Sequence, residues 1–248
     1  MVELLQMPKE LIVANWKLYP SSIGEAEKLA AAEAREARRF RNVEVVLCPP
    51  FPHVSCIMYR VSRIKSGGSR IALGAQDVFW ENAGAYTGEV SPAMLKKLGV
   101  QYAIIGHSER RKWLNETDEM INKKVLAAVK AGLKVILCVG EPLSVRKKGV
   151  SSAKKFVAKQ LKLALKGIGN WKLPARFALR SKAGGEIENL VVAYEPVWAI
   201  GTGHSDTPAD ALEMARFIRS IHVSRFTLRA SRVLYGGSVD GQNAESFI

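Results

Sequence analysis

Short apolar runs alternate with longer amphipathic stretches along most of this chain. Four of the longer stretches repeat their apolar residues at the period of an α-helix, and Ser22 and Thr207 are residue types that cap helix N-termini. Strands separated by helices predict βαβ units and a parallel sheet, so the fold class is α/β. The predicted strands are 11–14, 43–47, 71–75, 102–105, 134–138, 190–194 and 232–235, and the predicted helices are 22–39, 117–131, 151–167 and 207–222.

The length of 248 residues, with 48% hydrophobic residues, suits one domain spanning 1–248, since an α/β barrel typically needs about 250 residues. Residues 167–188 exceed an ordinary helix–strand connection, which predicts an inserted surface excursion. After the seventh strand, residues 241–248 begin a helix, and no further strand follows. We therefore expect an eight-stranded type of barrel without its last strand and helix, with low stability, association or reduced activity.

The charge is strongly basic, with 37 Lys and Arg against 23 Asp and Glu and a net charge of +14. Two stretches, 142–185 and 214–239, carry many basic residues and no acidic ones. Lysines of 154–166 are interleaved with apolar residues, which favours a solvated helix face. A basic surface that binds nucleic acid or another polyanion is the alternative.

No apolar run is long enough to cross a membrane, and the N-terminus lacks a signal-peptide pattern. The sequence therefore predicts a soluble, cytoplasmic protein that does not engage a membrane. Cys48, Cys56 and Cys138 are scattered without metal-binding spacing, so we expect reduced thiols and no metal site.

A carboxylate ends the apolar run 190–194, and a lid-like segment follows it at once. Glu195 stands where α/β barrels place catalytic groups, at the carboxyl end of a strand. Pro196 stops the strand, and Gly201 and Gly203 allow backbone amides to approach an anion closely. The pattern indicates a general base with its own lid.

Polar residues of complementary type follow other strands. His107 comes at the start of a helical turn, where backbone N–H dipoles oppose its protonation, so a neutral imidazole can donate to a carbonyl. Glu109 could orient Lys17 or join a proton network. Lys17 suits a phosphate or a developing oxyanion, and the Asn15 amide suits a neutral oxygen. After the seventh strand, a Gly-Gly pair and the Ser238 hydroxyl suit a phosphate.

From residue 12 to about 248 the chain resembles the triosephosphate isomerase family, on motifs in the family's order. These are Asn-Trp-Lys at 15–17, Gly-His-Ser-Glu-Arg-Arg at 106–111, Cys-Val-Gly-Glu at 138–141, Tyr-Glu-Pro-Val-Trp-Ala-Ile-Gly-Thr-Gly at 194–203 and Tyr-Gly-Gly-Ser-Val at 235–239. The resemblance implies a TIM (β/α)8-type barrel without cofactor or metal. It further implies interconversion of dihydroxyacetone phosphate and glyceraldehyde 3-phosphate, in glycolysis and gluconeogenesis, through an enediolate.

The resemblance also implies a role for each matching residue. Glu195 is the base and His107 the electrophile, Asn15 and Lys17 contact substrate, and Gly201 and Ser238 hold its phosphate. A homodimer through the loop 76–91 is implied as well, and nucleic acid is an unlikely partner.

Two features depart from the family's pattern. Residues 204–206 are His-Ser-Asp at the far hinge of the lid, where the family commonly has Lys and a small residue. A second Gly-Gly pair, which grips the phosphate after strand eight, has no counterpart after Ser238. A weakly active or inactive barrel with a basic polyanion-binding surface is therefore the alternative function.

Overall fold

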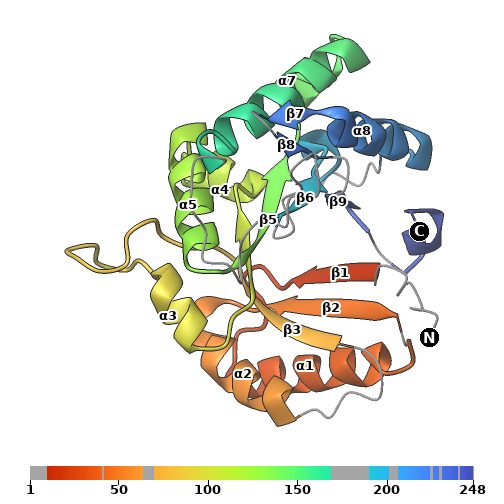
Figure 1. The fold of residues 1–248 in the computed structure, drawn as a ribbon. Coiled ribbons are helices and arrows are strands. Elements are labelled where there is room, and N and C mark those ends of the chain that lie inside the picture. The colour runs from red at the N-terminus through yellow and green to blue at the C-terminus, as the bar shows by residue number, and fades with distance from the viewer. Residues whose placement is uncertain are drawn as a thin grey trace, which may run out of the picture. The chain divides into compact units, whose positions relative to one another are not determined.

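The computed structural model describes residues 10–40, 42–63, 70–168, 190–200, 206–223, 226–228, 231–239 and 241–247. The chain divides into two compact units, Met1–Ala103 and Ile104–Ile248. Each unit is built from parallel strands joined through helices, as the ribbon in Figure 1 shows. Among the described residues, no helix is long and apolar enough to span a membrane.

The first unit is a parallel sheet covered by two helices that pack on each other. Strand β1 pairs with β2, β2 with β3, and β3 with the first residues of β4, all in parallel register. The buried face of α1 consists of four alanines, whose small side chains let the helix approach its neighbours closely. The elements are β1 (Glu10–Asn15), α1 (Ile23–Ala37), β2 (Val43–Cys48), η1 (Phe51–His53), α2 (Val54–Arg63), β3 (Arg70–Ala75), α3 (Pro92–Lys97) and β4 (Tyr102–Ile105).

The second unit carries the parallel strands β5, β6 and β9 in that order, with helices packed on them. A short antiparallel hairpin, β7 with β8, precedes β9. The elements are α4 (Ser108–Trp113), α5 (Asp118–Lys130), β5 (Lys134–Val139), α6 (Leu143–Arg146), α7 (Val150–Ala164), β6 (Leu190–Tyr194), η3 (Val197–Ala199), α8 (Pro208–Ser220), β7 (His222–Val223), β8 (Phe226–Thr227), β9 (Arg232–Tyr235) and η4 (Ala244–Phe247).

All seven predicted strands are confirmed, with ends that differ by at most one residue. The predicted caps are confirmed too, because the Ser22 side chain accepts the Glu25 N–H and the Thr207 side chain accepts the Asp210 N–H. The excursion at 167–188 lies almost wholly outside the described residues and stays a prediction, as does the single domain over 1–248.

The predicted end of the helix 207–222 was wrong. Helix α8 stops at Ser220, and His222 belongs to β7, where it pairs with Thr227. Ile221 has extended backbone angles, φ −76° and ψ 133°, which end the helix. The hairpin escaped the prediction because each strand is only two residues long, too short to show alternation.

The basic helix α7 has the amphipathic pattern expected of a solvated surface helix. Val157 and Leu161 are buried, whereas Lys155, Lys159 and Lys162 are exposed. Lys154 forms an ion pair of 2.7 Å with Glu213 of α8. The many lysines of α7 are therefore explained by an amphipathic helix that buries one face and exposes the other to water.

Register at the carboxyl ends of β5, β6 and β9 brings three consecutive strand ends together. Val139 pairs with Tyr194, and Tyr194 pairs with Tyr235. A Cβ on Gly140 would lie 1.6 Å from the Glu195 carbonyl oxygen. No side chain fits at this position.

Replacing Gly140 with Ala is expected to destabilise the protein by at least about 3 kcal/mol, because backbone atoms of Glu195 occupy the space of the new methyl group. Urea denaturation of the purified variant measures the loss. Gly24→Ala is the matched control, since nothing lies within 4 Å of a Cβ at Gly24. Equal stability of the two variants would show that the strand ends can separate freely.

Candidate active site

Glu195 is the first residue after β6 and lies between two glycines on the neighbouring strand ends. Its N–H donates to the Val139 carbonyl oxygen at 2.8 Å, which continues the β5–β6 ladder by one residue. On the other side, a Cβ on Gly236 would come within 2.9 Å of the Glu195 Cγ. Both neighbours must lack a side chain for Glu195 to occupy this place.

The Glu195 carboxylate is directed at the first turn of α4. Its Oε2 accepts the Ser108 N–H at 3.0 Å, and its Oε1 lies 3.4 Å from His107 Nε2. The side chain is only 6% exposed. Backbone N–H groups at a helix start favour negative charge, so α4 supplies the buried carboxylate with a suitable partner.

His107 caps the same helix, as the sequence predicted from its place after a strand. Its Nδ1 accepts the Glu109 N–H at 3.2 Å, so Nδ1 is the acceptor atom of the ring. In the neutral imidazole the single proton is then on Nε2, the nitrogen that faces Glu195. The helix start therefore selects one tautomer and aims its donor at the carboxylate.

The Glu109 carboxylate lies 3.7 Å from His107 Nδ1 and its side chain is 40% exposed. The structure thus brings His107, Glu109 and Glu195 together within the second unit. A part for Glu109 in proton transfer stays a prediction.

Ion pairs and a backbone hydrogen bond from its two arginines hold α4 in place. Arg111 donates through Nε to the Gly106 carbonyl oxygen at 2.9 Å and pairs through Nη1 with Asp118 at 2.7 Å. Arg110 and the buried Lys124 both pair with the buried Glu116. Because these charges compensate one another, the helix that orients His107 is fixed in place.

Glu141, the second residue after β5, supports the segment that follows Glu195. It is fully buried and accepts hydrogen bonds from the Tyr194 hydroxyl at 3.1 Å and from the Trp198 indole N–H at 3.1 Å. Burial, and next the negative charge of Glu141, raise the pKa of Tyr194, which keeps its hydroxyl as the donor.

No role for Glu141 is predicted from the sequence beyond its place in the Cys-Val-Gly-Glu motif. A carboxylate two residues after a buried strand, followed by an arginine at 146, was the available signal. Arg146 lies 4.0 Å from Glu141 Oε1 and 3.1 Å from Asp210 Oδ1. The buried carboxylate therefore has a cation within reach in addition to its two donors.

Ser238, predicted to contact phosphate, lies after β9 beside the first turn of the lid segment. Its hydroxyl donates to the Ala199 carbonyl oxygen at 2.9 Å. Asn243 donates to the Ser238 carbonyl oxygen at 3.2 Å. Gly201, the other predicted phosphate contact, lies outside the described residues.

In the first unit, Asn15 and Lys17 form a tight turn at the end of β1. Lys17 has a positive φ of 53°, an unusual conformation for a residue with a side chain. The Asn15 side chain accepts the Lys17 N–H at 3.1 Å, and Gln76 donates to the Lys17 carbonyl oxygen at 2.8 Å. These bonds hold the backbone of Lys17 in its unusual conformation.

Trp16, between these two residues, anchors the turn to α1. It is buried, and its indole N–H is shared between the two carboxylate oxygens of Glu33 at 3.1 and 3.2 Å. Burial raises the pKa of Glu33 to about 7, against a smaller lowering by the Trp16 hydrogen bond. No local pattern marks Glu33, because only the packing of α1 brings it to Trp16.

Parallel βα units with a buried carboxylate facing an imidazole at the strand ends define an α/β enzyme with acid–base chemistry. A family model described as triosephosphate isomerase matches residues 10–248. The chain belongs to the triosephosphate isomerase family.

Individual relatives agree with the family match. A protein named triosephosphate isomerase from Dictyoglomus thermophilum is 41% identical over 98% of this chain and 90% of its own length. Proteins of the same name from Carboxydothermus hydrogenoformans and Moorella thermoacetica are 42% and 43% identical, over 98% and 96% of this chain and 89% and 87% of theirs. The predicted family, the TIM (β/α)8-type fold class and the assignment as an isomerase are confirmed.

Glu33 makes the stability of the protein depend on pH. Its pKa is about 7 in the folded protein against 4.5 for the ordinary carboxyl group. Between these pH values the folded protein therefore keeps a proton on Glu33 that the unfolded chain has lost. The stability it contributes is complete below pH 4.5 and is lost as the pH rises through 7. The free energy of unfolding of Glu33→Gln, which cannot ionise, should therefore rise relative to that of wild type by on the order of 1 kcal/mol from pH 5 to pH 8.

Urea denaturation of both proteins at pH 5 and pH 8 checks this expectation. Glu36→Gln is the control, because Glu36 pairs with Arg39 on the exposed side of the same helix. Parallel pH profiles of wild type and Glu33→Gln would contradict the assignment to Glu33.

Proposed function

We propose that this chain interconverts dihydroxyacetone phosphate and glyceraldehyde 3-phosphate by proton transfer through an enediolate. The observation that carries the proposal is the pairing of Glu195 with His107, whose Nε2 lies 3.4 Å from the carboxylate. Membership of the triosephosphate isomerase family supports the substrate class.

In the proposed reaction, a Glu195 carboxylate oxygen accepts the proton from the carbon beside the substrate carbonyl. The electron pair of that C–H bond becomes the C=C bond of the enediolate, and the carbonyl oxygen gains negative charge. His107 stabilises this oxygen by donating its Nε2–H. The Nε2–H proton then passes to this oxygen, and the imidazole takes up the hydroxyl proton of the neighbouring oxygen, whose carbon becomes the new carbonyl. Return of the first proton from Glu195 to the former carbonyl carbon completes the isomerisation and regenerates the carboxylate.

For the donor to reach the substrate, the carbonyl oxygen must replace Glu195 Oε1 as the partner of His107 Nε2. Glu195 Oε2 keeps a second partner, the Ser108 N–H at 3.0 Å. The carboxylate then turns toward the substrate carbon as the imidazole turns to the substrate oxygen. Because Nδ1 accepts the Glu109 N–H, Nε2 is the ring nitrogen that carries the proton and faces the substrate oxygens.

The remaining contacts are proposed on the same basis. Lys17 and Asn15 contact the substrate's oxygens, and Gly201 and Ser238 bind its phosphate. The Asn15 side chain accepts the Lys17 N–H, and the Gln76 side chain donates to the Lys17 carbonyl oxygen. These hydrogen bonds support the assignment, since they fix the backbone from which the Lys17 side chain extends. Glu109 completes the proposed catalytic set beside His107.

Replacing Glu195 with Ala is expected to lower kcat by about 10²–10⁴-fold, the usual contribution of a positioned general base. A coupled assay measures turnover, and exchange of substrate carbon-bound hydrogen with deuterated water measures the proton transfer itself. Glu119→Ala is the matched control, since Glu119 is an exposed carboxylate paired with Lys123. Near-wild-type exchange in the Glu195 variant would exclude Glu195 as the base.

The proposal extends to a cytoplasmic homodimer in which the loop 76–91 contacts the second copy. Within that loop, Phe79 packs against Trp80 and Tyr86 at ring distances of 4.1 and 4.9 Å, and Tyr86 is 45% exposed. Sedimentation equilibrium is expected to give twice the chain mass. Substituting Tyr86 with Asp should shift the protein toward monomer, and an unchanged dimer would place the interface elsewhere.

A further inference from the structure

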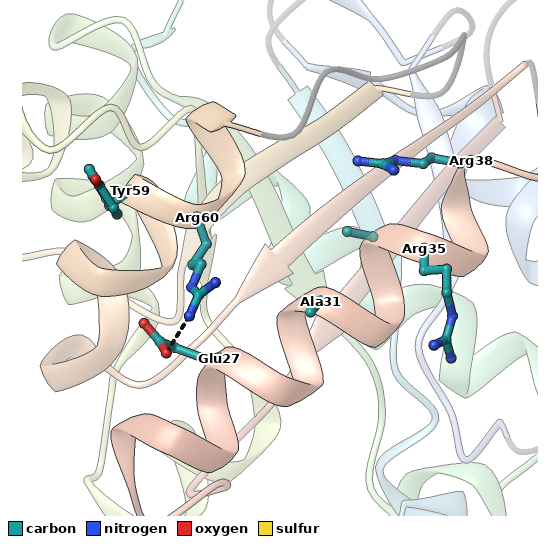
Figure 2. Close-up of a pocket in the computed structure, with 7 residues that line it drawn as sticks. Glu27, Ala31, Arg35, Arg38, Tyr59 and Arg60 are labelled. Atoms are coloured by element: carbon teal, nitrogen blue, oxygen red, sulfur yellow. Dashed lines mark hydrogen bonds and ion pairs between the residues drawn. The ribbon is translucent and has the colours of Figure 1, made fainter.

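A cavity of about 430 Å³ lies between α1 and α2 in the first unit, lined by seven described residues. It shares none of them with the catalytic or substrate-binding residues proposed above. Figure 2 shows the lining side chains along the two helices. They are Glu27, Ala31, Ala34, Arg35, Arg38, Tyr59 and Arg60.

The cavity exists because α1 presents small side chains where larger ones would fill the space. Ala31 and Ala34 contribute only methyl groups to the lining, and Ala34 is itself buried. Tyr59 adds an aromatic ring that is 55% exposed. A floor of methyl groups with a ring at its edge suits a flat apolar body rather than a bare ion.

The lining is basic, with three arginines against one glutamate. Arg60 pairs with Glu27 across the two helices at 2.7 Å, as the dashed line in Figure 2 marks. The same ion pair lowers the pKa of Glu27. Because Arg60 is neutralised by Glu27, the lining keeps a net charge of two positive charges, from the other two arginines.

Those two charges belong to Arg35 and Arg38 near the C-terminal end of α1. Arg35 lies 3.4 Å from Glu36, with a side chain that is 77% exposed, so solvent screens this contact. Arg38 has no ion pair with any described residue. Figure 2 shows its side chain extended along the helix end beside the cavity. Guanidinium groups match the planar oxygens of phosphate and carboxylate, and they stay charged at any physiological pH.

We propose that this cavity is a binding site for a small organic phosphate with a flat ring, of about the size of a nucleoside monophosphate. The ring lies on Ala31 and Ala34 beside Tyr59, and the phosphate is bound by Arg38, since the Arg35 side chain points away from Arg38 in Figure 2. The volume falls within the range of small-molecule pockets. The inference is independent of the isomerase reaction, since none of its residues is assigned a part in that reaction.

The test uses the full chain and isothermal titration calorimetry with three probes: adenosine monophosphate, adenosine and inorganic phosphate. We expect one site for adenosine monophosphate, with affinity about tenfold or more above that of either fragment, because only the whole molecule uses both the floor and Arg38. A saturating triose phosphate substrate is included throughout to occupy the isomerase site. Comparable affinity for inorganic phosphate alone would overturn the proposal.

Two variants locate the ligand. Arg38→Gln should weaken adenosine monophosphate by about tenfold or more through loss of a charged donor, and Ala31→Leu should do the same by filling the floor. Arg39→Gln is the matched control, because Arg39 is adjacent in sequence, pairs with Glu36 and does not line the cavity. Isomerase activity should stay unchanged in all three variants, which reports correct folding.

Unchanged affinity in Arg38→Gln and Ala31→Leu would overturn the proposal by placing the ligand elsewhere. Absence of binding at millimolar ligand would overturn it too. Binding of a single-stranded oligonucleotide that falls steeply with salt, without binding of the mononucleotide, would instead identify a non-specific basic surface.

Discussion

The register of β5, β6 and β9 is the constraint on which the candidate active site depends. One residue past each strand, two glycines flank Glu195, and each leaves space that a side chain would occupy. The backbone of Glu195 is hydrogen-bonded to Val139, so the carboxylate starts from a fixed point. Its partners on α4 can then be reached in only one direction. Glu195 can take this position because the residues on both sides of it, Gly140 and Gly236, have no side chain.

Three buried or half-buried carboxylates illustrate how partners decide what a carboxylate does. Glu195 faces backbone N–H and imidazole groups, and the proposed reaction exchanges the imidazole contact for one with a substrate. Glu141 accepts from a phenol and an indole and has Arg146 near it, which suits a permanent structural contact. Glu33 has one indole as its hydrogen-bond partner, and burial raises its pKa to about 7. The same residue type thus has a proposed catalytic role at Glu195, a structural role at Glu141 and an effect on the pH dependence of stability at Glu33, because its surroundings differ.

The basic character of the chain also has more than one physical meaning. On α7, exposed lysines alternate with buried Val157 and Leu161, as expected of an amphipathic helix in water. Between α1 and α2, arginines instead border a cavity with an apolar floor. Lysine on a convex helix face is solvated, whereas arginine beside a concave apolar surface can bind an anion that water does not fully surround. Net charge alone does not separate these situations.

The sequence by itself determined the strands, the caps at Ser22 and Thr207, and the place of His107 and Glu195 at strand ends, because these depend on local periodicity and on motifs of adjacent residues. It missed the β7–β8 hairpin, whose two-residue strands are too short for a pattern. It gave no role to Glu33 or Glu141, since their partners lie 17 and 57 residues away along the chain. Only the tertiary structure decided which side chains meet, because strand register and helix packing set distances that no local pattern contains.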